Sequence, residues 1–230
     1  MKILAFDTAL DACSVAVCDG RNVLARRHEH LSKGHAEALV PMIQSVLSAA
    51  STWFDELDLI AVTVGPGTFT GIRVGLSAAR GIALTTGVRV AGITTMAAIA
   101  EGVRQWREMG EGRAIVVLHD AGKAELYHQV FPLDGEITAL APAVIAPTDV
   151  PSVLPSGPVT VVGSGTELVR DQIKERHPDV RFSDVPFVPD AVHVARAGLK
   201  LAESDGIGNV PPQPLYLRAP DARLPGAPAQ

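Results

Sequence analysis

The chain has 230 residues and a formal net charge of −5, and aromatic residues make up 4% of it. A chain of this length buries roughly 70–75% of its unfolded surface, so one large domain or two smaller lobes are expected. The acidic balance and the few stacking side chains argue against a dedicated nucleic-acid binder, which presents a basic stripe with aromatic residues.

The cysteines and the start of the chain indicate a cytosolic protein. Cys13 and Cys18 are the only cysteines, and because their spacing is odd, their side chains point to opposite faces of one predicted strand. They are expected to be buried, unpaired thiols in a reducing compartment. Met1 and Lys2 lead directly into a strand without a signal peptide, and Arg89 interrupts the apolar stretch 81–100. A cytosolic protein without a membrane span is therefore expected.

Three strands in a meander are predicted first, at Lys2–Asp7, Cys13–Cys18 and 22–27, with short polar turns between them. A helix follows over 32–50, with Ser32 as its N-cap. Its apolar side chains recur at helical spacing and form a core stripe. Pro41 lies inside this helix and predicts a bend.

Residues 58–84 carry the most informative pattern. A β-branched run at 58–64 predicts a buried strand that leads into a glycine-rich loop and a helix over 71–84. Thr68 or Thr70 can cap this helix, and the backbone N–H groups of the loop suit an anion. The loop is not a P-loop, because Ile72 and Arg73 follow its last glycine instead of the Lys and Ser or Thr of that motif.

The same helix carries a strip of small residues, Gly71, Gly75 and Ala79, four positions apart. Two interior glycines destabilise a helix by roughly 1 kcal/mol each relative to Ala, so a compensating contact is expected. The strip allows a second helix to approach closely. That helix can belong to the same domain or to a partner.

The second half of the chain repeats the order of elements in the first. A strand at 113–119 ends at Asp120, as the first strand of the chain ends at Asp7. A return strand follows at 125–131. A strand at 159–162 then enters Gly163-Ser164-Gly165 and a helix, as 58–64 did. The repetition predicts a duplicated α/β fold whose two lobes face each other across a cleft, with residues 1–110 and 111–218 as the lobes.

The remaining elements are predicted from local signals. A strand at 88–92 and a helix from Thr94 complete the first half, and prolines mark loops over 142–158. Asp190 is the predicted cap of a last helix through Ala202. Residues 210–218 look strand-like, and the Pro-, Ala- and Gly-rich tail 219–230 is expected to be disordered.

A nucleotide site is the first chemical possibility. Asp7 and Asp120 end equivalent strands and are expected to look into the cleft from opposite sides, where a Mg-nucleotide would bind. The turn after Asp7 is Thr8-Ala9-Leu10 instead of a glycine-rich turn, and its side chains obstruct a phosphate. The sequence therefore favours a degenerate site.

Other catalytic arrangements have less support. The seven histidines supply no i, i+4 pair, and Gly163-Ser164-Gly165 lacks the register of a nucleophile elbow. Both cysteines lie within a predicted strand. The polar group Asp120, Lys123, Glu125 and Tyr127 is interpreted as a hairpin turn with an exposed ion pair worth under about 1 kcal/mol.

Five stretches together resemble the bacterial TsaB family, formerly YeaZ. They are FDTALDACSVAV at 6–17, LVPMI at 39–43, GPGTFTGIRVGLSAARGIAL at 65–84, the pattern D-A-x-K-x-E-L-Y at 120–127 and PLYLR at 214–218. They cover nearly the whole chain in the expected order, and the long central motif is highly specific. Gly122 departs from the pattern, since an Arg is usual there.

The resemblance implies a two-lobed fold of the actin-like ATPase superfamily, with mixed sheets flanked by helices. It also implies a role in forming threonylcarbamoyladenosine beside the anticodon of tRNAs that read codons starting with A. In that system the catalytic subunit is a paralogue, TsaD, while TsaE is an ATPase and TsaC supplies threonylcarbamoyl-AMP. By resemblance, this chain is a degenerate paralogue without catalysis of its own. The resemblance implies that it binds and supports TsaD, associates with TsaE through the complex, contacts tRNA only indirectly and forms a homodimer when alone.

The resemblance also assigns residues, and it favours a partner over internal packing for the small-residue strip. The partner interface is expected on the helices that match 35–50 and 71–84, at His35, Leu39, Met42, Ile43, Val46, Gly71, Gly75, Ala78, Ala79 and Ile82. The vestigial nucleotide cleft is expected at Asp7, Thr8, Gly65, Gly67, Thr68, Asp120, Lys123 and Glu125. No metal and no cofactor are expected, while ATP or ADP at the partner interface is left open.

The alternative is an enzyme that acts alone. Asp7 and Asp120 favour an ATP-dependent small-molecule kinase, and older family labels suggested a glycoprotease-like peptidase. Micromolar Mg-ATP binding that Asp7→Ala abolishes would support the kinase. Direct tRNA binding would appear as a steeply salt-dependent affinity and is not expected.

Overall fold

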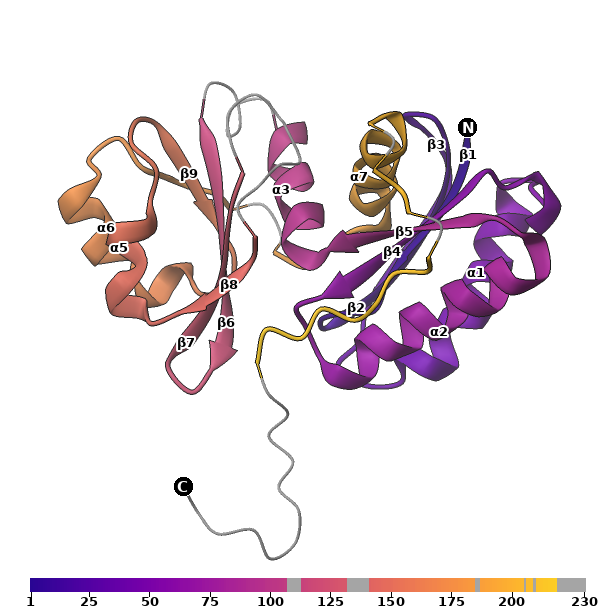
Figure 1. Ribbon diagram of the computed structural model, residues 1–230, viewed down its shortest axis with the longest axis horizontal. Coiled ribbons are helices and arrows are strands. Elements are labelled where there is room, and N and C mark those ends of the chain that lie inside the picture. Colours follow the sequence, from indigo (N-terminus) through magenta and orange to yellow (C-terminus); the bar gives the residue numbers. More distant parts are fainter. Residues whose placement is uncertain (107–112, 132–140, 185–186, 205, 209, 219–230) are drawn as a thin grey trace, which may run out of the picture.

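The computed structural model describes residues 1–106, 113–131, 141–184, 187–204, 206–208 and 210–218. Two five-stranded sheets form two lobes, with helices between them and on their outer faces (Figure 1). The strand orders are β3-β2-β1-β4-β5 and β10-β9-β6-β7-β8. Each sheet combines an antiparallel meander with parallel strands in equivalent places, so the predicted duplicated two-lobed α/β fold is confirmed.

The first sheet consists of β1 (Lys2–Asp7), β2 (Ala12–Asp19), β3 (Asn22–His30), β4 (Leu59–Gly65) and β5 (Arg89–Thr94). On β2, Cys13 and Cys18 enter hydrophobic clusters on opposite faces of the sheet, as their spacing predicts. Burial raises the pKa of Cys13 to about 12 and that of Cys18 to about 11. Both cysteines are therefore protonated core thiols.

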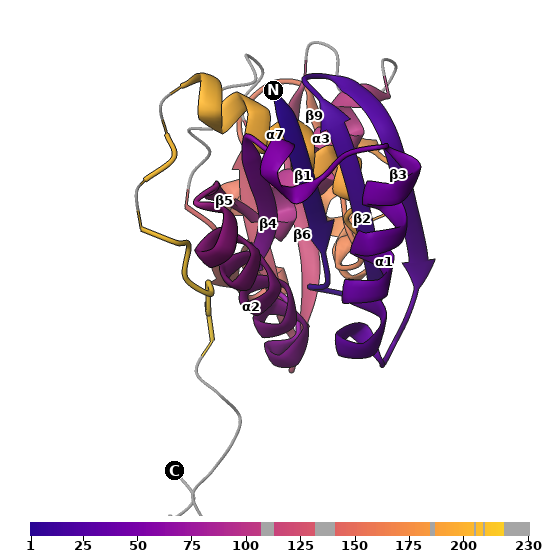
Figure 2. The ribbon, with the colours of Figure 1, turned by 90° about the vertical axis from the view of Figure 1, so that its right-hand side faces the viewer.

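Helices α1 (His35–Ala49) and α2 (Phe69–Thr86) lie side by side on the outer face of the first sheet (Figure 2). Thr68 caps α2, since its hydroxyl accepts a hydrogen bond from the N–H of Gly71 at 3.1 Å. The predicted N-cap of α1, Ser32, is wrong. Gly34 occupies that position with a φ of 85°, a left-handed conformation that a serine rarely adopts.

Helices α3 (Thr95–Gln105) and α7 (Ala191–Glu203) lie between the two sheets (Figure 1). Asp190 caps α7 as predicted, accepting from the N–H of Val192 at 2.8 Å. Although α7 follows the second sheet in sequence, it packs on the inner face of the first sheet. The two lobes are therefore not made of two consecutive halves of the chain throughout. The predicted division into lobes at residue 110 stays a prediction.

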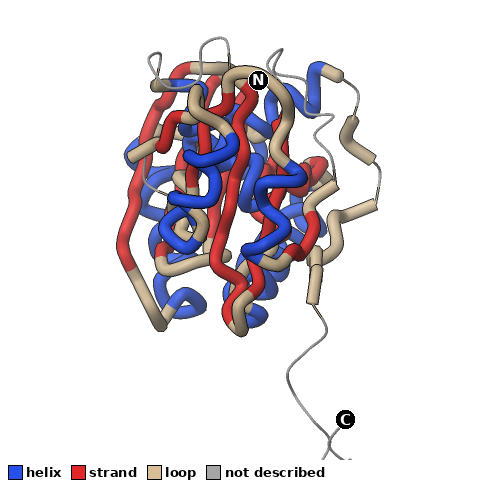
Figure 3. Tube along the Cα trace, turned by 90° about the vertical axis from the view of Figure 1, so that its left-hand side faces the viewer, coloured by secondary structure: helices blue, strands red, loops and turns tan. Residues whose placement is uncertain are grey.

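The second sheet consists of β6 (Ala114–Gly122), β7 (Glu125–Phe131), β8 (Ala143–Ile145), β9 (Val159–Val162) and β10 (Arg181–Phe182). Helices α5 (Val150–Val153) and α6 (Arg170–Arg176) cover its outer face (Figure 3). Short 3₁₀ turns are η1 (Phe54–Glu56), η2 (Pro147–Asp149) and η3 (Thr166–Leu168). Pro147 and Pro151 lie in the first turns of η2 and α5, where proline is tolerated, and not in loops as predicted.

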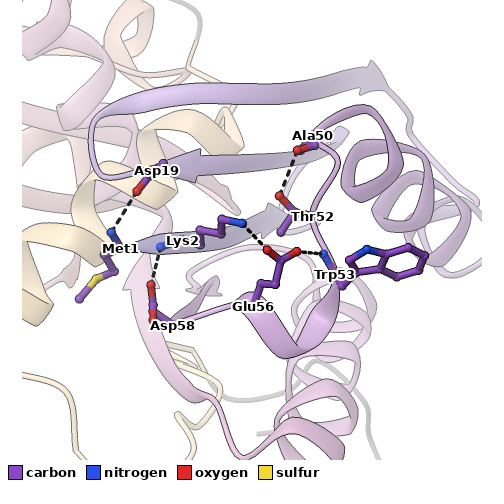
Figure 4. A network of polar contacts seen from close by, with 8 residues as sticks. All are labelled: Met1, Lys2, Asp19, Ala50, Thr52, Trp53, Glu56 and Asp58. Atoms are coloured by element: carbon purple, nitrogen blue, oxygen red, sulfur yellow. Dashed lines mark hydrogen bonds and ion pairs between the residues drawn. The ribbon is translucent and has the colours of Figure 1, made fainter.

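Polar contacts fix the amino end of β1 (Figure 4). The amino group of Met1 lies 3.0 Å from Asp19, and the backbone N–H of Lys2 donates to Asp58 at 2.6 Å. The ammonium group of Lys2 also pairs with Glu56 at 2.7 Å. These contacts hold β1 at the end opposite Asp7.

Residues 210–218 run back along the first sheet in an extended form (Figure 1). They do not form the predicted strand. The N–H of Leu215 donates to the carbonyl of Val64 at 2.8 Å, but this single hydrogen bond does not extend into a regular strand pairing. The predicted disorder of 219–230 lies outside the described residues. Within the described ranges, no helix has the length and apolar character that a membrane span requires.

Candidate functional site

The turn after β1 packs directly on the glycine loop after β4. The carbonyl of Ala9 accepts from the N–H of Thr68 at 2.8 Å. A Cβ atom at Gly67 would lie 2.4 Å from the carbonyl oxygen of Ala9, and one at Gly71 would lie 2.0 Å from that of Thr8. Because the two loops touch, they leave no room between them for a phosphate group.

Asp7 lies at the base of this contact and is fully buried. Its Oδ1 accepts from the hydroxyl of Thr63 at 2.6 Å and from the N–H of Ala9 at 3.1 Å, while its Oδ2 has no partner among the described residues. Burial raises the pKa of Asp7 to about 7, against the effect of these two hydrogen bonds. A buried carboxyl that readily stays protonated does not suit a hydrated Mg-nucleotide.

Asp120 has a different environment from Asp7. It is exposed at the end of β6, and its carboxylate accepts from the N–H of Gly122 at 2.8 Å. The two aspartates therefore do not form the symmetrical pair expected from the sequence, because only Asp7 is covered by the loop after β4. In the described ranges, no three His, Cys, Asp or Glu side chains gather as a metal site.

The hairpin between β6 and β7 holds the other predicted cleft residues. Lys123 and Ala124 form its two-residue turn with φ values of 58° and 57°, which glycine or asparagine adopts more readily. Glu125 pairs with Arg218 at 3.1 Å, so its ion-pair partner comes from the C-terminal segment and not from the hairpin itself.

A serine and a histidine that looked isolated in the sequence meet in the second lobe. The hydroxyl of Ser164 lies 2.9 Å from Nδ1 of His119 and also accepts from the N–H of Asp120 at 3.0 Å. Burial lowers the pKa of His119, and the nearby Asp120 and Asp11 oppose that effect. The pair joins the loop after β9 to the end of β6. Sequence reasoning missed it because 45 positions separate the two residues.

The small-residue strip of α2, which was predicted for a partner interface, lies inside the first lobe. Gly71, Gly75 and Ala79 are buried within the chain. A Cβ at Gly75 would lie 2.8 Å from the hydroxyl of Thr8 and 3.3 Å from Val62. The close approach that the two glycines permit is therefore made to the chain's own first sheet and turn.

Most of the predicted interface residues share this inward orientation. Those buried in the first lobe are Leu39, Met42, Ile43, Val46, Gly71, Gly75 and Ala79. Those that are only half-buried are His35, Ala78 and Ile82. Most of the residues predicted for the interface therefore lie on the core-facing stripes of α1 and α2.

An open groove of about 460 Å³ lies between the amino-terminal halves of α1 and α2. Its lining residues are Ala36, Leu39, Val40, Phe69, Thr70, Arg73, Val74, Ser77 and Ala78. Val40 and Phe69 are about half exposed, at 52% and 49%. Two adjacent helices therefore each leave an apolar side chain partly in water beside this groove.

Only Leu39 and Ala78 of the groove were selected from the sequence. The missed signal is a second stripe on α2, Phe69, Arg73 and Ser77, which recurs every four residues beside the core stripe. An exposed Phe on that stripe marks the groove.

Comparisons with known proteins identify the family. A family model described as "TsaD: tRNA N6-adenosine threonylcarbamoyltransferase" matches residues 27–207. The Escherichia coli K12 protein named "tRNA threonylcarbamoyladenosine biosynthesis protein TsaB" is 32% identical over 238 aligned positions, which cover 98% of this chain and 99% of that protein. The chain belongs to the TsaB family. A Mycobacterium tuberculosis H37Rv relative, Rv3421c, is 30% identical over 96% of this chain and 93% of its own length.

Solved structures agree with membership of the TsaB family. The structure "YeaZ from Pseudomonas aeruginosa" has a TM-score of 0.78 and 28% identity, and the match covers 94% of this chain and 99% of that one. The ROK hexokinase of Thermus thermophilus has a TM-score of 0.54 at 15% identity, covering 90% of this chain and all of that one. At that identity, the second match supports the two-lobed fold and not an activity.

Proposed function

We propose that this chain is a non-catalytic subunit in the biosynthesis of threonylcarbamoyladenosine on tRNA, and that it binds and stabilises the catalytic paralogue TsaD. The open groove between α1 and α2 carries the proposal, because it leaves apolar side chains of two helices unpaired on one face. Membership of the TsaB family supplies the pathway, through the names of its relatives.

The contact between the turn after β1 and the glycine loop after β4 favours a non-catalytic role. In an ATP-dependent enzyme of this fold, phosphates would approach the turn after β1, and here Thr8 and Ala9 are in contact with Gly71 and Gly67. Asp7, which would face the metal, is buried beneath that contact. Both features favour a subunit that acts through its surface.

The rest of the proposed assembly follows from the same role. TsaE, the ATPase, associates with this chain through the complex, and tRNA contacts it only indirectly. In the absence of the paralogue, the exposed groove is covered by a second copy in a homodimer.

Ser77→Arg is expected to weaken binding to the paralogue by about 100-fold or more, because a charged side chain placed in an apolar contact must lose its hydration. Ser77 is exposed and lines the groove, so the variant is expected to fold normally. Isothermal titration of the purified chain with the paralogue measures the loss.

The matched control for this experiment is Ser156→Arg, which makes the same change at an exposed position in the second lobe. It is expected to bind as the wild type does. Equal affinity of the Ser77 variant and the control would place the docking surface elsewhere.

A peptidase acting alone is the second candidate, since one matching structure is described as similar to "peptidase YEAZ". The Ser164 and His119 pair is the observation that favours it. A serine-directed phosphonate that labels the wild-type chain, but not Ser164→Ala, would support this candidate. The proposed docking role predicts that neither protein is labelled.

A further inference from the structure

Arg73 stands out among the residues of the α1–α2 groove. It is the one charged side chain among the lining residues, all of which the structure describes. Its guanidinium carbon lies 3.4 Å from the ring centroid of Phe69, one turn earlier on α2, and 5.7 Å from that of Tyr216. The two rings stack with an interplanar angle of 25°. The cation is therefore held against an aromatic surface at the rim of the groove.

Arg73 differs from the other stacked arginines of the chain. Arg170 lies over Phe182 and pairs with Glu167, and Arg104 lies near Phe131 and pairs with Glu101. Arg73 has no such carboxylate within the described ranges. Its positive charge is fixed in position but has no ionic partner there.

The C-terminal segment fixes the second ring of the stack. On one side of Tyr216, Leu215 packs into the core of the first lobe and donates its N–H to Val64. On the other side, Leu217 packs against the cluster of α3 and the second sheet. Arg218 then donates to the carbonyl of Ala121 and pairs with Glu125. Tyr216 is thus anchored from both directions, which limits the movement of the stack.

We propose that Arg73 is the specificity-determining cation of the docking groove, and that the partner protein presents a carboxylate to it from an apolar segment that fills the groove. This inference rests on the proposed docking function and adds the chemistry of the partner. A guanidinium group binds a carboxylate through two parallel hydrogen bonds. Because stacking already restricts Arg73, little conformational entropy is lost when the pair forms, and the partner's apolar residues would shield the pair from salt.

The test measures the affinity of the full chain for the paralogue by isothermal titration at low and at high salt. Arg73→Glu is expected to lower the affinity by about 100-fold, because it places two carboxylates together. Arg73→Lys keeps the charge but loses the planar fork, so a loss of roughly tenfold is expected. Tyr216→Ala leaves the charge in place and frees the stack, so a smaller loss is expected, and the salt dependence should increase as the pair becomes more exposed.

The control is Arg176→Glu, which makes the same charge reversal at an exposed position on α6. If Arg73→Glu and this control bind equally well while Ser77→Arg abolishes binding, the groove docks the paralogue without using Arg73, and the inference is wrong. If the wild-type chain does not bind the paralogue at all, both the inference and the proposed function fail.

A second copy of this chain could supply the carboxylate instead. Glu37 is exposed and is the acidic residue on α1 and α2. If Arg73→Glu disrupts self-association, measured by analytical ultracentrifugation, while paralogue binding is unchanged, Arg73 serves a homodimer and the proposal is overturned.

Discussion

Gly71→Ala is expected to lower the free energy of unfolding by about 3 kcal/mol or more, at the upper end of the range for overpacking. The new Cβ would lie 2.0 Å from the carbonyl oxygen of Thr8, and a backbone oxygen cannot rotate away. Either α2 or the turn after β1 must move, which would also strain the 2.7 Å hydrogen bond from the Thr8 hydroxyl to the carbonyl of Gly71. Urea unfolding followed by circular dichroism measures the change.

Gly81→Ala is the matched control, because it makes the same substitution on the same helix. A Cβ at Gly81 meets nothing within 4 Å, so the higher helix propensity of Ala should stabilise the chain by about 0.5–1 kcal/mol. A Gly71→Ala variant as stable as the wild type would contradict the close contact that closes the turn after β1.

Asp7→Asn is expected to change how stability depends on pH. Burial raises the pKa of Asp7 from its ordinary value of 3.8 to about 7, so the folded chain retains a proton that the unfolded chain releases. The contribution of Asp7 to the free energy of unfolding is fully present below about pH 4 and is lost as the pH rises to about 7. The difference between 3.8 and 7 corresponds to about 4 kcal/mol.

The Asn variant keeps an acceptor for Thr63 and Ala9 but does not ionise. Its free energy of unfolding, minus that of the wild type, should therefore increase by about 4 kcal/mol between about pH 4 and pH 8. Urea titrations at several pH values give this difference. A flat difference for Asp7→Asn would mean that water or a cation reaches the carboxylate.

Local patterns predicted most of the elements because the signals that set them lie within a few residues. Thr68 and Asp190 cap helices where the sequence placed them, and the return strand Glu125–Phe131 has its predicted bounds. The destination of α7 could not be predicted in this way. A cap fixes where a helix begins, but it does not say which sheet the helix covers.

The site was only partly predictable for the same reason. Glycines on a helix indicate close packing, but packing against Thr8 and packing against a partner require the same small residues. The groove depends on which stripe of α2 remains exposed, and its aromatic stack joins Phe69 to Tyr216 from the distant C-terminal segment. Contacts between distant segments leave no periodic pattern in the sequence.

Reconstitution of tRNA modification tests the central claim most directly. The purified chain is combined with tRNA, threonylcarbamoyl-AMP, the ATPase TsaE and the paralogue, and threonylcarbamoyladenosine is measured by mass spectrometry. The proposal predicts no product when the paralogue is omitted, full product with all components, and little product when Ser77→Arg replaces the wild type. Product formed without the paralogue, or undiminished product with the Ser77 variant, would contradict it.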